Sequence, residues 1–496
     1  MTLTKEQYKD IAGKMRFNTK AFINGKFVDA NDGNTFDTIN PLTGKVIATV
    51  AHCSDADVDT AVKIARETFE SGVWSRCDPE HRKTVLLKLA DLLDENVNEL
   101  AVLESLDTGK TISDCLEEIG VEGPRHIRWY AELIDKTFGK VAPTTEDKLA
   151  IIVQEPVGVA GLIVPWNFPL LMAIWKIAPS LAAGCSSIVK PAEDTPLSVL
   201  RFAELVIEAG IPNGVLAVLP GFGATTGQAI GRHEDINIIS FTGSTQTGGK
   251  FLSYAGETNL KAVALELGGK SPFIVLDDAD LTDELIDNAV NSAFWNGGQN
   301  CSANMRQIVD KSLVEEFTKK VIERTKQYVL GDPLDPNTDI GTMITQKHKE
   351  RVESFIQSGI DEGAVMVHGG AVDLDGPYVH PTIFTGVTAN MKIAKEEIFG
   401  PVLGIMEVDG MEEALALASD SEFGLHATVF TNDLDRAIYM GRRIPCGTVS
   451  INEFSEGNIA TPFGGYKKSG SSLTRDNGTE AMQQYLQDKT IWISRK

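Results

Sequence analysis

The feature that most constrains the fold is a regular alternation of short apolar runs and helical segments, which begins after Gln154. The expected strands lie at 157–164, 187–189, 215–219, 236–241 and 262–265, and the expected helices at 171–183, 197–209 and 225–230. Strands that alternate with helices predict a parallel sheet covered on both faces. Right-handed crossovers then place ligands at the carboxyl ends of the strands.

The second half of the chain repeats this alternation. Expected strands lie near 273 and 307 and at 403–408, 428–431 and 448–451, and expected helices lie near 285 and at 313–329, 411–418 and 434–443. The chain has 496 residues, which is too many for one core and enough for two or three domains. We therefore expect an α/β fold with two α/β domains.

The first hundred residues and the C-terminal segment also predict individual helices and strands. Residues 21–28 predict a hairpin that turns at Asn24-Gly25, and a helix is expected after Ser54. Residues 84–103 continue in helical pattern. The terminal segment 490–494 predicts a strand without a partner nearby in sequence, so we expect it to pair with another element or subunit.

The composition excludes several classes of protein. With 46 Lys+Arg against 69 Asp+Glu the net charge is −23, which argues against nucleic-acid binding. The longest apolar stretch, 157–175, is interrupted by Pro165, Asn167 and Pro169, and it predicts a strand, a loop and a helix start rather than a membrane span. Six scattered cysteines form no CxxC pair, so neither a disulfide framework nor a metal site is expected. Without an apolar N-terminal segment, we expect a cytoplasmic protein.

Cys301 lies in the glycine-rich segment 296–302, between a helical pattern and a strand pattern. Glycines allow positive φ values and a close approach of the backbone to a ligand. A cysteine on such a loop is a candidate nucleophile. The alternative is a small buried apolar residue, and other motifs must decide between the two readings.

Two glycine loops, at 221–227 and 241–248, each follow a strand and open a helix. The exposed N–H groups of helix N-termini bind phosphate. Neither loop is the GxGxxG fingerprint, and ordinary tight turns are the alternative. A further strand ends at Lys190 with Glu193 three residues on, an arrangement that suits ribose hydroxyls and disfavours a 2′-phosphate. The pattern favours NAD over NADP, although a solvated Lys–Glu pair is an equally simple reading.

Two polar residues lie at other strand ends. Asn167 stands between Pro165 and Pro169 on a rigid strand exit, where its amide could donate to an oxyanion. Glu266 ends a strand before two glycines, and a carboxyl group in apolar surroundings can serve as a general base. A purely structural role remains the simpler reading for each residue taken alone.

Taken together, these segments resemble the aldehyde dehydrogenase superfamily over nearly the whole chain. Its motifs occur in order at 165–169, 190–193, 241–244, 265–270, 298–301, 396–401 and 462–470. Segments 127–131, 165–171 and 489–494 most resemble the members that oxidise γ-glutamyl-γ-aminobutyraldehyde and other aminoaldehydes in polyamine breakdown.

The resemblance implies a role for each matching residue. Cys301 would form a thiohemiacetal and then a thioester, Asn167 and the Cys301 backbone N–H would hold the oxyanion, and Glu266 would activate water. NAD is the implied cofactor. The residues implied to bind it are Val164, Pro165, Trp166, Lys190, Glu193, Gly223, Gly227, Phe241, Gly243, Ser244, Thr247, Leu267, Gln346, Glu397 and Phe399.

The family's substrate tunnel maps onto a set of aromatic and acidic residues. Aromatic rings with carboxylates would suit an aldehyde with a distal cation, although the glutamates could simply be solvated. The loop 452–456 adds further acids, and Asn300 and Ser302 flank the nucleophile. The residues expected to line the tunnel are Glu118, Glu122, Phe168, Trp175, Phe294, Asn300, Ser302, Glu453, Phe454 and Phe463.

The resemblance also implies an organisation in three parts. A Rossmann-type dinucleotide-binding domain would comprise 1–135 and 156–268, a catalytic domain 269–475, and a bridging element 136–155 with 476–496. That element implies a homodimer or homotetramer. Other functions stay open: oxidation of betaine aldehyde or of uncharged aliphatic and aromatic aldehydes, a thiol esterase or hydrolase, or a non-catalytic relative.

Overall fold

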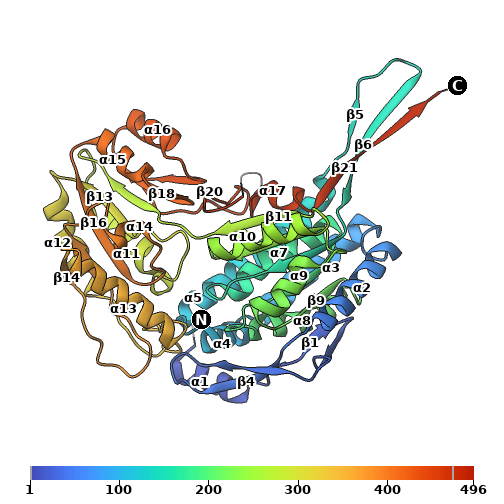
Figure 1. The fold of residues 1–496 in the computed structure, drawn as a ribbon, viewed down its shortest axis with the longest axis horizontal. Coiled ribbons are helices and arrows are strands. Elements are labelled where there is room, and N and C mark those ends of the chain that lie inside the picture. Colours follow the sequence, from blue (N-terminus) through green and yellow to red (C-terminus); the bar gives the residue numbers. More distant parts are fainter. Residues whose placement is uncertain (1–2, 472–473, 496) are drawn as a thin grey trace.

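The computed structural model describes residues 3–471 and 474–495, and it contains two large sheets and one small projecting sheet (Figure 1). The first large sheet has a parallel centre, with an antiparallel hairpin at one edge. Its strands run in the order β11 (Ala262–Leu267), β10 (Ile238–Gly243), β7 (Val159–Ile163), β8 (Ser186–Lys190), β9 (Leu216–Val218), β1 (Ala21–Ile23) and β2 (Lys26–Val28).

Helices cover both faces of this sheet, as the alternation predicts. Ala160 and Leu162 of β7 face one core with helices α3, α4, α6, α7 and α8, while Val159 and Ile163 face another with α2, α9 and α10. The helices of this half are α1 (Lys5–Lys14), α2 (Asp55–Ser71), α3 (Pro79–Glu95), α4 (Val97–Thr108), α5 (Ile112–Glu117), α6 (Gly123–Leu133), α7 (Pro169–Ala183), α8 (Leu197–Ala209), α9 (Gln228–Arg232) and α10 (Thr245–Glu257).

The second large sheet is also mainly parallel and forms the other lobe in Figure 1. Its strands run in the order β14 (Val365–His368), β15 (Thr382–Thr385), β16 (Val402–Val408), β13 (Arg306–Asp310), β12 (Pro272–Val275), β18 (His426–Phe430) and β19 (Thr448–Ile451). The helices of this lobe are α11 (Asp283–Phe294), α12 (Val314–Thr325), α13 (Gln346–Asp361), α14 (Lys392–Lys395), α15 (Met411–Ser419) and α16 (Leu434–Arg443).

A three-stranded antiparallel sheet projects from the body of the molecule (Figure 1). The C-terminal strand β21 (Leu486–Ser494) pairs along its length with β6 (Lys148–Pro156), which also pairs with β5 (Lys140–Ala142). The expected strand 490–494 therefore has a partner within its own chain. The short helix α17 (Gly478–Gln483) precedes β21 in the chain. The structure also contains two small two-stranded sheets, formed by β3 (Thr35–Ile39) with β4 (Val46–Ala51) and by β17 (Phe423–Gly424) with β20 (Tyr466–Lys467).

The helical pattern predicted at 84–103 belongs to two helices. In the structure α3 ends at Glu95 and α4 starts at Val97. Asn96 between them has φ −108° and ψ 12°, outside the α region, and its side chain donates to the Leu92 carbonyl at 2.7 Å. Asparagine bonds to nearby backbone groups in this way and so interrupts helices, which apolar periodicity alone does not reveal.

Of the helices described, none is long and apolar enough to cross a membrane.

Candidate active site

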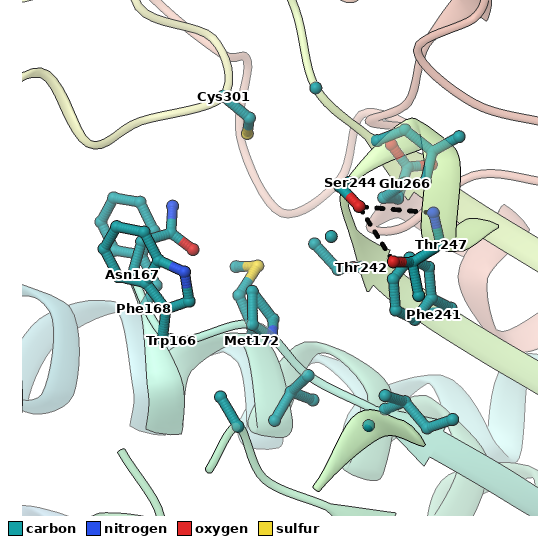
Figure 2. A pocket seen from close by; sticks show the side chains of 18 of the residues that line it. Trp166, Asn167, Phe168, Met172, Phe241, Thr242, Ser244, Thr247, Glu266 and Cys301 are labelled. Carbon is teal, nitrogen blue, oxygen red and sulfur yellow. Dashed lines mark hydrogen bonds between the residues drawn. The ribbon is translucent and has the colours of Figure 1, made fainter. Parts of the chain in front are cut away.

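A cavity of about 510 Å³ lies where the carboxyl ends of the first sheet face loops of the second lobe. Figure 2 shows the Cys301 thiol pointing into the space that Asn167, Met172 and Glu266 border. The cavity brings together most residues that the sequence nominates: Val164, Pro165, Trp166, Asn167, Phe168, Trp175, Lys190, Glu193, Gly223, Gly227, Phe241, Gly243, Ser244, Thr247, Glu266, Leu267, Cys301, Glu397, Phe399 and Phe463.

The loop that carries Cys301 has an unusual backbone. After α11, Asn296, Gly297 and Gly298 all have left-handed φ values, of 51°, 60° and 71°. A β-carbon on Gly298 would lie 2.7 Å from the Gly400 carbonyl group, so only glycine allows the two loops to pack this closely. The turn leaves Cys301 half-buried at the cavity wall.

Asn167 leaves the end of β7 and is 5% exposed. Its side-chain amide donates to the Gln299 carbonyl oxygen at 3.0 Å, and Asn296 donates to the Asn167 carbonyl at 3.2 Å. The amide is therefore fixed two residues from the nucleophile. Because an amide nitrogen carries two hydrogens, one N–H remains for an oxyanion on the carbon that Cys301 attacks.

Glu266 lies near the end of β11 and is 6% exposed. Its Oε2 atom has no hydrogen-bond partner within the described part of the chain. Burial raises the pKa of this carboxyl well above its usual range, and nearby Asp476 adds to the rise, while Lys176 and Arg475 oppose it. Lys176 itself is paired with Asp476 at 2.9 Å in the buried layer beneath. The arrangement suits a group that must accept a proton at neutral pH.

The surroundings of the Cys301 thiol favour its protonated form. Burial raises its pKa well above the usual range, and the negative charges of Glu456, Glu397 and Glu266 raise it further. The thiolate is the nucleophile, so attack on a substrate requires removal of the thiol proton. Glu266, on the wall of the same cavity, is the candidate base.

The first sheet offers a binding surface that fits a dinucleotide. Lys190, at the end of β8, pairs with Glu193 at 3.2 Å, and the Gly223 N–H faces the Glu193 carboxylate at 3.5 Å. Burial alone would raise the pKa of Glu193, but the charge of Lys190 overcomes this and lowers it. The Glu193 carboxylate therefore stays ionised, as an acceptor for ribose hydroxyls.

The second glycine loop completes this surface. Ser244 caps α10 by accepting from the Thr247 N–H at 3.3 Å, so the helix N-terminus opens toward the cavity (Figure 2). A β-carbon on Gly243 would lie 2.6 Å from the Phe241 ring, so only glycine allows the loop to pass this close to that ring. The buried Thr242 hydroxyl lines the cavity and lacks a partner among the described residues. These groups fit the pyrophosphate of NAD.

The loop of Glu397 forms the opposite wall. Glu397 accepts from the Gly269 N–H at 3.1 Å, and burial raises its pKa to about 7. Phe399 has φ 60°, and its carbonyl oxygen bonds to Nε2 of His348 at 2.7 Å. Arg351 donates to the Glu397 carbonyl at 2.8 Å. The sequence prediction missed His348 and Arg351, although both line the cavity.

Gln346 is a correction to the predicted cofactor residues. It is the exposed first residue of α13, and its side chain donates to Glu350 at 3.3 Å. It lies at a separate depression and does not line the cavity. Residues two apart on a helix point to nearly opposite sides, so Gln346 faces away from the cavity while His348 lines it.

Phe168, Trp175 and Phe463 line the cavity beside the nucleophile, together with Met172. Trp175 meets Phe463 edge-on at 5.5 Å between ring centroids, and its indole Nε1 is buried without a described partner. This wall is apolar and aromatic, so it suits the chain of an aldehyde or a cation lying over the rings.

Two of the predicted tunnel acids lie elsewhere. Glu118 is buried and paired with Lys110 at 2.5 Å, so its charge is already matched. Glu122 is partly exposed and contacts Arg125 and His126, and like Glu118 it does not line the cavity. Both acids fall in a π-helical turn, Glu118–Glu122, which changes the faces that side chains occupy.

Three further predicted tunnel residues also differ from expectation. Glu453 is exposed to solvent. Phe294 is fully buried in the core of the second lobe, with its ring edge-on to Tyr328. Phe454, in the loop 452–456, packs edge-on against the ring of His426. None of the three lines the cavity.

Asn300 and Ser302, which flank the nucleophile, were also expected to line the tunnel, but both are buried and neither lines the cavity. They share a partner that the prediction did not single out. The Ser302 hydroxyl donates to the half-buried Glu456 carboxylate, and the Asn300 side chain lowers the pKa of the same carboxyl, which burial raises. The sequence points only to an acidic loop at 452–456. It does not indicate which acid turns inward.

Comparison with known proteins agrees with this geometry. The profile of the aldehyde dehydrogenase family matches residues 27–491. The chain is 46% identical to aminoacetaldehyde dehydrogenase of Pseudomonas aeruginosa over 491 residues, covering 99% of both chains. It is 45% identical to the NADP/NAD-dependent aldehyde dehydrogenase PuuC of Escherichia coli, covering 98% of both. Among solved structures, the γ-glutamyl-γ-aminobutyraldehyde dehydrogenase of Burkholderia cenocepacia superimposes with a TM-score of 0.97 at 42% identity, covering 100% of both chains.

The chain therefore belongs to the aldehyde dehydrogenase family. It is an NAD(P)-dependent oxidoreductase, and it has the fold of that family, as the sequence resemblance implied. A related structure with a TM-score of 0.97 and 44% identity, AldA indole-3-acetaldehyde dehydrogenase of P. syringae, is a complex with NAD+ and covers 99% of this chain and 100% of its own.

Proposed function

We propose that this enzyme oxidises an aldehyde with a distal cationic group to the carboxylic acid, with NAD as the preferred acceptor. One observation carries the catalytic part of the proposal. Cys301, Asn167 and Glu266 line a single cavity whose other wall is the dinucleotide-binding surface. The substrate part rests on the aromatic wall and on relatives that carry the names of aminoaldehyde dehydrogenases.

The first step is addition of the thiol to the aldehyde. Cys301 Sγ forms a bond to the carbonyl carbon, and the thiol proton leaves for a base in the cavity, for which Glu266 is the candidate. The carbonyl oxygen becomes an oxyanion. The free N–H of Asn167 and the backbone N–H of Cys301 would stabilise it, and protonation gives the thiohemiacetal.

Bound NAD supplies an acceptor for the hydride that leaves the thiohemiacetal carbon as the C=O bond re-forms and a thioester remains. Lys190 and Glu193 would hold the adenosine ribose, and Gly243 and Ser244 the pyrophosphate. Glu397 would hold the nicotinamide ribose, with Phe399 packed nearby. The ionised Glu193 would repel a 2′-phosphate, which favours NAD over NADP.

Release of the acid requires water. Glu266 would take a proton from water as the water oxygen bonds to the thioester carbon, and the C–S bond then breaks to restore Cys301. Its buried position keeps the carboxyl basic enough for this task, and its unpartnered Oε2 can accept the proton. The products are the carboxylic acid and the free thiol.

The test of this function is NADH formation with a panel of aldehydes: aminoaldehydes, 4-guanidinobutyraldehyde, betaine aldehyde, indole-3-acetaldehyde and simple aliphatic aldehydes. We expect kcat/KM to be highest for the cationic aldehydes. Cys301→Ala should abolish turnover and leave NAD binding intact, as a rise of the thermal midpoint on adding NAD would show. Absence of NADH from every aldehyde, with the cysteine reduced, would reject the proposal.

A thiol hydrolase that works without redox chemistry is the contrasting reading of Cys301. Such an enzyme needs no dinucleotide, so NAD should leave its thermal midpoint unchanged. The ion pair of Lys190 with Glu193 and the open N-terminus of α10 favour the dehydrogenase. Ester hydrolysis at the wild-type rate in Glu266→Gln, without NAD stabilisation, would favour the hydrolase.

We also propose an oligomer and a three-part organisation. The division into 1–135 with 156–268, 269–475, and 136–155 with 476–496 follows the family pattern, and the projecting sheet supports it. Trp492 on β21 is 62% exposed, and its neighbours Ile491 and Ile493 are exposed too, as expected of a surface that another subunit covers.

The cysteines described are all unpaired, which supports a reducing, cytoplasmic location.

A further inference from the structure

We propose that a small cavity behind the active-site wall is an anion site, in which Lys270, Ser271 and Arg306 hold one chloride-sized anion. The cavity lies between the start of β12, the end of α15 and the segments that lead into β18 and β19. Its volume is about 10 Å³, which is close to the space that one water molecule or one small ion requires. None of the described residues lines both this cavity and the one that holds Cys301.

Lys270 lines this cavity, and its charge has no partner in the chain as described. The residue is 4% exposed, and its Nζ atom has no hydrogen-bond partner among the described residues. The other buried lysines of the described chain all have partners: Lys110 pairs with Glu118, Lys176 with Asp476 and Lys190 with Glu193, and Lys261 donates to two backbone carbonyl groups. Because an unpaired buried charge is very costly, an ammonium at this position requires an anion from outside the chain.

Arg306 brings a second cation to the same place. It lies opposite Pro272 in the parallel pair of β12 with β13, and side chains of such register partners lie on the same face of a sheet. Pro272 lines the cavity, and Nη2 of Arg306 donates at 2.7 Å to the carbonyl of Leu417, next to Ala418 in the cavity wall. Arg306 is 2% exposed, and its Nε and Nη1 atoms lack hydrogen-bond partners in the described part of the chain. The guanidinium therefore lies close to the cavity with two donors unused.

The remaining polar groups of the cavity wall bring no negative charge. Ser271 is 2% exposed, and its hydroxyl also lacks a partner among residues 3–471 and 474–495. Burial lowers the pKa of His426 to about 4, so its imidazole is neutral. Burial raises the pKa of Cys446 to about 12, so its thiol keeps its proton. An anion would thus meet two cations, a hydroxyl donor and neutral walls.

A bound anion would also fix the protonation of Lys270. Burial and the charge of Arg306 lower the pKa of Lys270 to about 7, while the charges of Glu397 and Glu396 oppose the fall. Near neutral pH the side chain is therefore divided between ammonium and neutral amine, and an anion favours the ammonium. The cavity is too small for sulfate or phosphate. The flexible lysine stem can adjust to chloride, which is slightly larger than water.

The site lies directly behind the catalytic segments. Its lysine and serine follow Gly269, whose N–H donates to Glu397 at 3.1 Å. A β-carbon on Gly269 would lie 2.5 Å from the Cys301 carbonyl oxygen, so this turn touches the nucleophile loop. Leu425 lines the small cavity and belongs to the same apolar cluster as Phe168 of the active-site wall. An anion here would stabilise the back of the active site without touching substrate or cofactor.

The test is thermal unfolding of the full chain during a titration with sodium chloride, in which sodium gluconate keeps the ionic strength constant. No NAD or aldehyde is added, so the result does not depend on the proposed function. We expect the thermal midpoint to rise by about 1 °C for each tenfold increase in chloride above saturation, because the ion binds only the folded chain. Lys270→Met should abolish this rise. Lys468→Met is the matched control and should keep it, since Lys468 is exposed and paired with Glu422.

Diffraction gives a second measurement that needs no variant. Crystals of the wild-type chain soaked in sodium bromide should show an anomalous peak in contact with Lys270 and Ser271. Ser271→Ala, which keeps both cations, should weaken the chloride response without abolishing it. Equal midpoints in chloride and gluconate would overturn the proposal, as would a chloride response that persists in Lys270→Met. A cavity that holds only water in the bromide crystals would overturn it as well.

Discussion

The side-chain amide of Asn167 donates a hydrogen bond to the carbonyl oxygen of Gln299 at 3.0 Å, two residues before Cys301. Asn167 comes from the end of a strand in the first sheet, and Cys301 lies on a loop of the second lobe. One hydrogen bond thus sets the distance between the oxyanion donor and the nucleophile. The contact holds the Asn167 amide beside the nucleophile loop, as a preorganised oxyanion donor requires.

Asn167→Ala should lower kcat by about 10²- to 10³-fold, because it removes an oxyanion donor. It should also loosen the nucleophile loop, since the Gln299 carbonyl loses a partner. Steady-state kinetics with a single aldehyde measure the first effect, and the thermal midpoint measures the second. Asn296→Ala is the comparison, because it removes a second donor to the Gln299 carbonyl and the donor to the Asn167 carbonyl, but no group that lines the cavity. A wild-type kcat in Asn167→Ala would contradict the assigned role.

Glu266→Gln should separate the two halves of the reaction. If Glu266 activates the water that releases the acid, its amide variant should form NADH once per active site and then turn over about 10²- to 10⁴-fold more slowly. Stopped-flow measurement of NADH would show the burst, and mass spectrometry would find the thioester on Cys301. Loss of the burst itself would instead mean that Glu266 is needed mainly to deprotonate the thiol.

The pH dependence of Cys301 reactivity follows from its raised pKa. Below that pKa the thiolate fraction rises about tenfold per pH unit, so the rate of alkylation by iodoacetamide should climb from neutral pH into the alkaline range. Glu456→Gln removes a negative charge and should move this profile to lower pH. Glu397→Gln should do the same by a smaller amount. A profile that is flat above pH 7 would show that Cys301 is already ionised.

We predict that cofactor preference depends on the charge of Glu193. Glu193→Gln should raise the ratio of kcat/KM with NADP to that with NAD by about tenfold, because repulsion of a 2′-phosphate is removed while Lys190 remains. Kinetics with both cofactors at fixed aldehyde concentration measure the ratio. The effect should shrink at high salt, where partly exposed charges are screened. An unchanged ratio would place the discrimination elsewhere.

The sequence was sufficient for the sheet alternation and for placing Asn167 and Glu266 at the ends of strands. Gly184 and Gly210 end α7 and α8 in left-handed conformations, as expected of C-caps. Motifs that are continuous in the chain, such as 165–169 and 265–270, could be placed residue by residue. Residues of both motifs line the cavity, because the end of the preceding or surrounding strand points toward it.

Residues between motifs could not be placed in this way. Side chains at Gln346 and His348 differ by two positions on a helix, and only the helix start at Thr345 decides which one faces inward. Glu118 was expected to face substrate, but Lys110 is near enough to neutralise it. Glu456 and Glu453 look alike in sequence, and the hydrogen bonds of their loop to Asn288 and His426 separate them. Each case depends on contacts distant in the chain.

The exposed strand β21 leads to a prediction about assembly. Trp492 is 62% exposed in the isolated chain, and an aromatic side chain on a projecting sheet is costly to leave in water. Trp492→Glu should therefore yield a smaller species in light scattering coupled to gel filtration. Leu434→Glu is the control, since Leu434 is equally apolar and exposed but lies at the start of α16. An unchanged mass in Trp492→Glu would show that subunits associate through another surface. A change in both variants would indicate nonspecific effects of charge.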